Sequence, residues 1–238
     1  MTITIHQPEH LPWLGLFHKI DMADTYIVLD NVQYRRRYFQ NRNKIRTDKG
    51  WQWLTVPIEN EDRNTLQIKD ARICNVNDKW KRKNLESIFN HYHRAQFFDT
   101  YWDQFKTIYL GNHEHLMEFN VAIIKFFLET LYIRTEIRFA SEMNVNGKKG
   151  DLILNLCLAA GAGEYISGIS GHDYLDLEKF EKSGIKVVFQ EFHHPIYTQC
   201  HEPFIPCMSV VDLLFNYGPD SSKIINGVSV PVIEQIFV

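Results

Sequence analysis

The chain has 238 residues, a formal net charge of −3 and 45% hydrophobic residues, which is ordinary for a globular protein. Its four cysteines form no C-x-x-C pair and no disulfide-like spacing, so we expect free thiols and a cytoplasmic location. No membrane span is expected, because Lys125 and Glu129 interrupt the most apolar run, residues 121–132. Residues 1–8 lack the features of a secretory signal. The slightly acidic balance argues against nucleic acid as a partner.

The first 30 residues predict a βαβ unit. Residues 2–6 contain β-formers and read as a strand. Pro8 and Pro12 exclude a helix between them, and Pro12 suits the start of a helix over residues 13–22. Residues 25–29 form a second apolar strand that ends at Asp30. This order of elements is typical of two parallel strands joined by a helix.

The middle of the chain changes character twice. Residues 33–49 are polar, basic and aromatic without clear periodicity, whereas residues 51–58 and 66–73 predict strands separated by a charged turn at 59–64. Apolar residues three and four apart then predict helices over 80–92, 97–110 and 115–131. We interpret residues 80–132 as a helical insertion; an independent helical subdomain is the alternative.

The α/β pattern returns after the insertion. Strands are predicted at 135–140, 165–167 and 185–192, and helices at 151–160, 177–182 and 209–216. Strands that alternate with helices favour a parallel sheet with right-handed crossovers. The sequence therefore predicts an α/β fold: one Rossmann-like domain over residues 1–238, with a mostly parallel sheet, flanking helices and the helical insertion.

Ligands of open parallel sheets bind beyond the carboxyl ends of the strands. His6 ends the first predicted strand and is a candidate general base, followed by Gln7; Asp30 ends the second strand as a candidate catalytic partner, followed by Gln33. The alternative for His6 is a partly buried side chain that donates to a backbone carbonyl. No metal site is expected, since Pro8 keeps His6 and His10 off a common helix face.

Two further segments predict binding. Six basic residues fall within positions 35–46, and among the residues of this loop we expect Arg37, Asn41 and Arg42 to bind substrate phosphates. A solvated loop and a nucleic-acid site are the alternatives for it. Trp13 is either a platform for a sugar ring or a packing residue.

A small-residue loop, residues 167–171, follows the predicted strand at 165–167. The N–H groups around Ser167, Gly168 and Ser170 are candidates to hold a phosphate or an oxyanion, and a tight turn is the alternative. The loop matches neither the phosphate-binding motif G-x-x-x-x-G-K-[ST] nor the nucleophile motif G-x-S-x-G.

Residues 5–15, I-H-Q-P-E-H-L-P-W-L-G, resemble the opening of the WbqC-like family. The resemblance continues at residues 19–20, 23–24, 30–34, 40–43, 53–57, 165–168, 174–176 and 213–218. It brings Tyr174 into the candidate substrate-binding set. His10 is a departure, because an aromatic residue such as Tyr is expected there, and this argues against a direct chemical role for position 10.

The family's name associates it with bacterial surface-polysaccharide and O-antigen loci, so the resemblance implies a nucleotide-linked or lipid-linked sugar as substrate. Acyl or aminoacyl transfer to the amine of a nucleotide-activated amino sugar is the leading hypothesis. The donor and any cofactor are unidentified, and a homo-oligomer is compatible with the exposed aromatics. The alternatives are a non-catalytic adaptor that binds a sugar nucleotide or a partner enzyme, and an ATP-dependent ligase.

Overall fold

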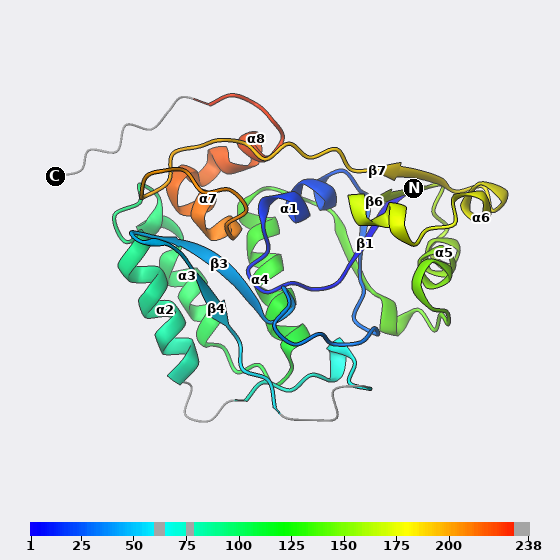
Figure 1. The fold of residues 1–238 in the computed structure, drawn as a ribbon, viewed down its shortest axis with the longest axis horizontal. Helices are drawn as coiled ribbons and strands as arrows, with labels where there is room; N and C mark the ends of the chain where they lie inside the picture. Colours follow the sequence, from blue (N-terminus) through cyan, green and yellow to red (C-terminus); the bar gives the residue numbers. More distant parts are fainter. Residues whose placement is uncertain (60–64, 75–78, 231–238) are drawn as a thin grey trace.

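The chain begins with the predicted βαβ unit (Figure 1). In the computed structural model, which describes residues 1–59, 65–74 and 79–230, β1 (Thr2–His6) pairs in parallel with β2 (Thr25–Val28). Helix α1 (Leu14–Asp21) connects them and begins just after Pro12, as predicted. The two prolines keep residues 7–12 out of helix and so leave a loop at the carboxyl end of β1.

Five strands form one parallel sheet in the order β5-β2-β1-β6-β7. The later strands are β5 (Glu136–Phe139), β6 (Glu164–Ser167) and β7 (Lys186–Phe189). This arrangement confirms the predicted α/β fold with a parallel sheet. Strand β7 is shorter than predicted, because after Phe189 the chain turns across α1, where Gln190 Nε2 donates to the Gly15 carbonyl at 2.8 Å.

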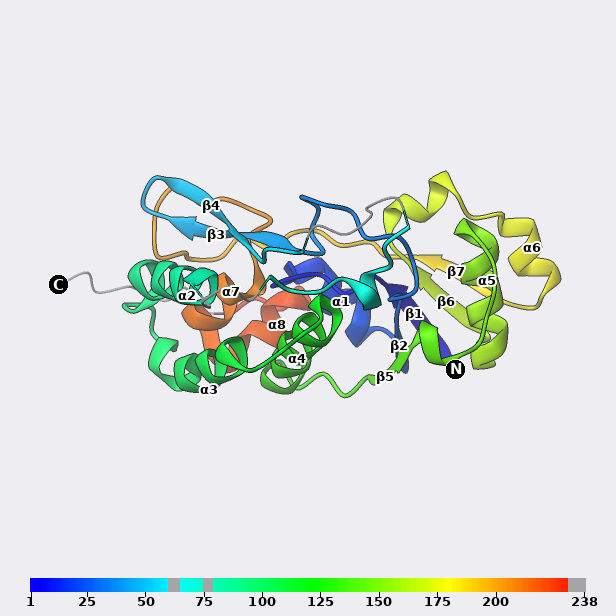
Figure 2. The same ribbon diagram turned by 90° about the horizontal axis from the view of Figure 1, so that it is seen from below.

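The two faces of the sheet are covered by different apolar clusters. In β2, Tyr26 and Val28 pack into the cluster that contains α1, whereas Ile27 packs into the cluster that contains α5 (Lys149–Ala160) and α6 (Leu177–Lys182). Side chains of a strand alternate between faces, which explains the division. Figure 2 shows α5 and α6 together beside β6 and β7, away from α1.

The three predicted helices of the insertion are confirmed. They are α2 (Lys79–Tyr92), α3 (Phe98–Leu110) and α4 (Leu116–Thr130), and they pack with α7 (Val210–Tyr217) and α8 (Ser221–Ile225). One apolar cluster runs from α1 and β2 through all of these helices. These helices thus share their core with the face of the sheet that α1 covers.

A two-stranded antiparallel hairpin, β3 (Arg42–Thr47) and β4 (Gly50–Thr55), lies over α2 (Figure 2). The prediction of a strand at 51–58 is confirmed in β4, but β3 was not predicted, because its basic and polar residues give no apolar alternation. Long-range bonds stabilise it instead: Asn43 Nδ2 donates to the Leu11 carbonyl at 2.9 Å.

The prediction of a strand at 66–73 is wrong. The segment contains the 3-10 turn Ile68–Asp70, and its backbone groups bond to several different segments. Ile68 N donates to Val32 and Ile73 N donates to Glu114, so no single partner strand exists to form a ladder. The predicted turn at 59–64 lies outside the described residues except for Glu59. No helix of the described segments is long and apolar enough to cross a lipid bilayer.

Candidate active site

A crevice opens between the carboxyl ends of β1 and β6. The chain leaves β1 through α1 and leaves β6 toward α6, which cover opposite faces of the sheet, so the two connections diverge at this point. Divergent connections leave a ligand-sized gap in doubly wound sheets. Here the gap has a volume of about 580 Å³. Its lining consists of His6, Trp13, Gly15, Leu16, Lys19, Gly168, Ile169, Ser170, Gln190, Glu191, Phe192 and His193.

His6 lies at the end of β1 and contacts two charged side chains. Its Nδ1 is 3.0 Å from Lys19 Nζ, and its Nε2 is 3.2 Å from Glu9 Oε1. An ammonium only donates, so Nδ1 accepts from Lys19 and the Nε2–H donates to Glu9. Burial and then the Lys19 charge lower the pKa of His6, although Glu9 opposes the shift. The lowered pKa favours the neutral imidazole.

Lys19 is the cation of this array and is only 3% exposed. Burial lowers its pKa to about 8, against the opposing effect of Glu9. The amine faces Gly168 across the crevice: a Cβ atom added at Gly168 would lie 3.9 Å from Lys19 Nζ. A lysine with a pKa near neutral acts as a proton donor and acceptor at physiological pH.

Glu9 completes the array from the loop between β1 and α1. Pro8 turns the chain, so that Glu9 folds back onto His6 without a helix between them. Glu9 is 8% exposed, and its second oxygen, Oε2, has no hydrogen-bond partner within the described part of the chain. The arrangement Glu9–His6–Lys19 joins a carboxylate, an imidazole and an amine, and it can relay a proton toward the crevice.

Sequence reasoning missed Glu9 and Lys19 as site residues. Lys19 had a detectable signal: with Leu16 and Ile20 it follows the i, i+3, i+4 spacing of the buried face of α1. A lysine at such a position is buried when this face of the helix packs on the sheet. For Glu9, the only signal was its place in the loop beyond the strand end.

Several predicted residues meet in the crevice. His6, Trp13, Gly168 and Ser170 all line it. Ser167 is fully buried below, and its Oγ donates to the Gly168 carbonyl at 3.0 Å. The indole of Trp13 contacts Phe192 edge to face at 5.4 Å between ring centroids.

Asp30 lies apart from the crevice lining. It is fully buried, and its two oxygens accept from Ser141 N at 2.9 Å and from Ser141 Oγ at 2.6 Å. These bonds connect the carboxyl ends of β2 and β5. The two residues predicted to be catalytic, His6 and Asp30, therefore make separate contacts.

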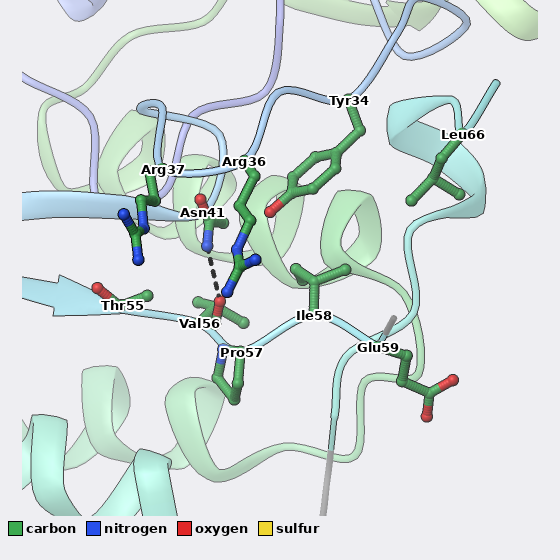
Figure 3. Close-up of a pocket in the computed structure, with 10 residues that line it drawn as sticks. All are labelled: Tyr34, Arg36, Arg37, Asn41, Thr55, Val56, Pro57, Ile58, Glu59 and Leu66. Atoms are coloured by element: carbon green, nitrogen blue, oxygen red, sulfur yellow. Dashed lines mark hydrogen bonds between the residues drawn. The ribbon is translucent and has the colours of Figure 1, made fainter. Parts of the chain in front are cut away.

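The remaining predicted residues also lie outside the crevice lining. Gln7 Oε1 accepts from Gln40 Nε2 at 2.6 Å, and Gln33 forms an isolated bridge with Gln67. Arg37 and Asn41 line a separate hollow (Figure 3), Arg42 stacks 4.1 Å above the Trp53 ring, and Tyr174 lines a third hollow beside Lys148 and Lys149. The structure thus distributes the predicted binding residues over several surfaces.

No group of three or more His, Cys, Asp or Glu side chains in the described residues is arranged to hold a metal ion. His10 is fully buried, with its Nε2 3.2 Å from the Tyr109 hydroxyl, and burial lowers its pKa to about 3. It packs in the core beside Phe119.

The sequence matches the model of the WbqC-like protein family over residues 7–224. It is also similar to the uncharacterised protein Rv1507c of Mycobacterium tuberculosis, with 31% identity over 221 residues that cover 92% of this chain and 95% of that protein. No solved structure matches the chain. The extent of the family match confirms the resemblance found in the sequence, and the chain belongs to the WbqC-like protein family.

Proposed function

We propose that this protein is a cytoplasmic enzyme of bacterial glycan assembly, which transfers an acyl or aminoacyl group to the amine of a nucleotide-activated amino sugar. The observation that carries the proposal is the Glu9–His6–Lys19 array at the crevice. The association of the family's name with surface-polysaccharide loci supports the sugar substrate. The acyl donor is unidentified.

In the proposed transfer a proton must leave the sugar ammonium, and Lys19 of the Glu9–His6–Lys19 array is the proposed acceptor. A sugar ammonium must lose a proton before its nitrogen attacks the acyl carbonyl carbon. Because burial lowers the pKa of Lys19 to about 8, a fraction of the molecules carries a neutral amine at neutral pH, and this amine accepts the proton. Hydrogen bonding through His6 to Glu9 stabilises the ammonium that results. The C–N bond then forms and the bond from the carbonyl carbon to the leaving group of the donor breaks, and the second proton of the amine passes to that leaving group.

The crevice suits a nucleotide sugar in size and surface. A volume of about 580 Å³ lies within the range of small-molecule sites. Trp13 and Phe192 offer apolar faces for a ring, and Ser170 offers a hydroxyl. In this proposal the sugar ring lies against Trp13, with its amine directed toward Lys19.

Binding of a UDP-linked amino sugar should raise the melting temperature of the protein. A ligand at a hundred times its dissociation constant stabilises by about 2.7 kcal/mol, which corresponds to about 5–10 °C for a chain of this length. Thermal unfolding with nucleotide sugars, free nucleotides, ATP and coenzyme A thioesters measures it. A shift with ATP alone would favour the ligase, and no shift with any nucleotide sugar would refute the proposed substrate.

Lys19→Met should abolish transfer and keep the fold, with a stability difference from wild type that depends on pH. The pKa of Lys19 is about 8 in the folded chain against an ordinary 10.5, so the unfolded chain binds more protons between these values. The free energy of unfolding of wild type therefore rises relative to that of Lys19→Met between about pH 8 and 10, by an amount on the order of 2 kcal/mol.

Urea unfolding at several pH values, together with a transfer assay, measures both effects. Lys106→Met on the exposed face of α3 is the matched control and should behave as wild type. If the Lys19→Met and wild-type stabilities keep a constant difference across this pH range, the amine does not have a lowered pKa. If transfer survives in Lys19→Met, the residue is not the proton acceptor. If wild type binds the sugar nucleotide but does not turn it over, the protein is an adaptor.

Gly15→Ala should weaken sugar binding without unfolding the protein. Gly15 lies in the first turn of α1, and an added Cβ would collide with the Trp13 indole, which must then move from its place beside Phe192. Alanine is favoured over glycine in a helix by about 1 kcal/mol, which offsets the cost of the displacement. The ¹⁹F NMR signal of 5-fluorotryptophan at position 13, assigned with Trp13→Phe, should shift. An unchanged signal and unchanged affinity would contradict a platform role for Trp13.

A further inference from the structure

A second hollow lies between the loop of residues 34–41 and the segment that follows β4, with a volume of about 260 Å³ (Figure 3). Its lining and the lining of the β1–β6 crevice have no residue in common. The transfer chemistry proposed for the crevice gives this hollow no role.

Two consecutive arginines, Arg36 and Arg37, extend side by side into this hollow (Figure 3). In extended backbone, consecutive side chains point to opposite sides. Arg37 instead has a φ of +58°, in the left-handed region that suits glycine or asparagine and costs energy for other residues. This backbone brings both guanidinium groups over the end of β4.

Neither guanidinium group has an acidic partner among the residues that the structure describes. Within residues 1–59, 65–74 and 79–230, neither one makes an ion pair or a side-chain hydrogen bond. Glu59 is the acidic residue of the lining, and its Oε2 lies 3.7 Å from Nε of Arg72 instead. Two like charges that share one hollow repel each other, so an anion bound between them is stabilised by both.

The walls of the hollow are fixed by contacts within the chain. Asn41 is 5% exposed, and its Nδ2 donates to the Val56 carbonyl at 2.9 Å, which ties the arginine loop to the end of β4. Buried Val56 and Leu66 give an apolar floor, and the Tyr34 hydroxyl points toward Arg36 (Figure 3). An apolar floor strengthens the attraction between the guanidinium groups and an anion.

We propose that this hollow is a binding site for the phosphoryl group of a small phosphate monoester. A guanidinium group presents parallel N–H donors that match two oxygens of one phosphate. Two such groups carry a double positive charge, which matches the dianion of a monoester better than a single carboxylate. The volume of about 260 Å³ fits a small molecule.

Isothermal titration with methyl phosphate tests the site directly. We expect wild type to bind methyl phosphate. Arg36→Gln and Arg37→Gln should each lower the affinity for methyl phosphate at least about tenfold, which corresponds to the loss of one charge-assisted contact. Arg35→Gln is the matched control, because Arg35 is an exposed neighbour outside the lining. Affinity should rise with pH through about 6, where a phosphate monoester becomes a dianion, and acetate should not bind.

Arg37→Gly separates a ligand role from a structural one. Glycine adopts a φ of +58° without strain, so this variant should melt at a higher temperature than wild type yet bind methyl phosphate no better than Arg37→Gln. A lower melting temperature would mean that the arginine side chain serves the fold.

Three results overturn the proposal: no binding of methyl phosphate by wild type, equal binding by the Arg36 and Arg37 variants, or an equal loss in Arg35→Gln. Lys19→Met should bind methyl phosphate as wild type does, since the two linings are separate. The two proposals are therefore tested independently: a result that refutes phosphate binding at this hollow does not refute the proposed transfer reaction, and the reverse also holds.

Discussion

The burial of the Lys19 amine is the constraint on which the arrangement of the site depends. Helix α1 packs on the sheet through Leu14, Leu16, Phe17 and Ile20, and this packing takes Lys19 out of water. An isolated buried ammonium is costly, so it requires partners within reach. His6 and Glu9 supply them, and both come from the strand end and loop that precede α1. Apolar packing thus fixes the position of the charged array.

Short-range patterns predicted most of the fold. The apolar runs at β1, β2, β5 and β6 and the spacing in α2, α3 and α4 were sufficient, because these elements bury their own apolar faces. Strand β3 and the segment at 66–73 were misjudged for the opposite reason: their conformations depend on bonds to distant residues. Local sequence contains little information about such bonds, and the basic, polar residues of β3 conceal the pairing.

The strand-end rule predicted where the site lies better than which residues form it. It placed His6, Gly168 and Ser170 at one edge of the sheet, and all three line one crevice, because the carboxyl ends of parallel strands share an edge. The same rule could not tell that Asp30 bonds Ser141 or that Gln7 bonds Gln40, since both partners come from loops of unknown path. Lys19 was overlooked because a helical lysine is usually solvated.

The two charged sites differ in how their charges are satisfied, and this difference bears on what each does. Lys19 has partners inside the chain, so its position is fixed before any substrate arrives, and such preorganisation suits chemistry. Arg36 and Arg37 lie together with exposed guanidinium groups, and the backbone at Arg37 bears the cost of holding them there. A cost of this kind persists where surrounding structure enforces it, often at ligand sites. This difference agrees with the two proposals, in which the crevice moves a proton and the arginine hollow holds an anion.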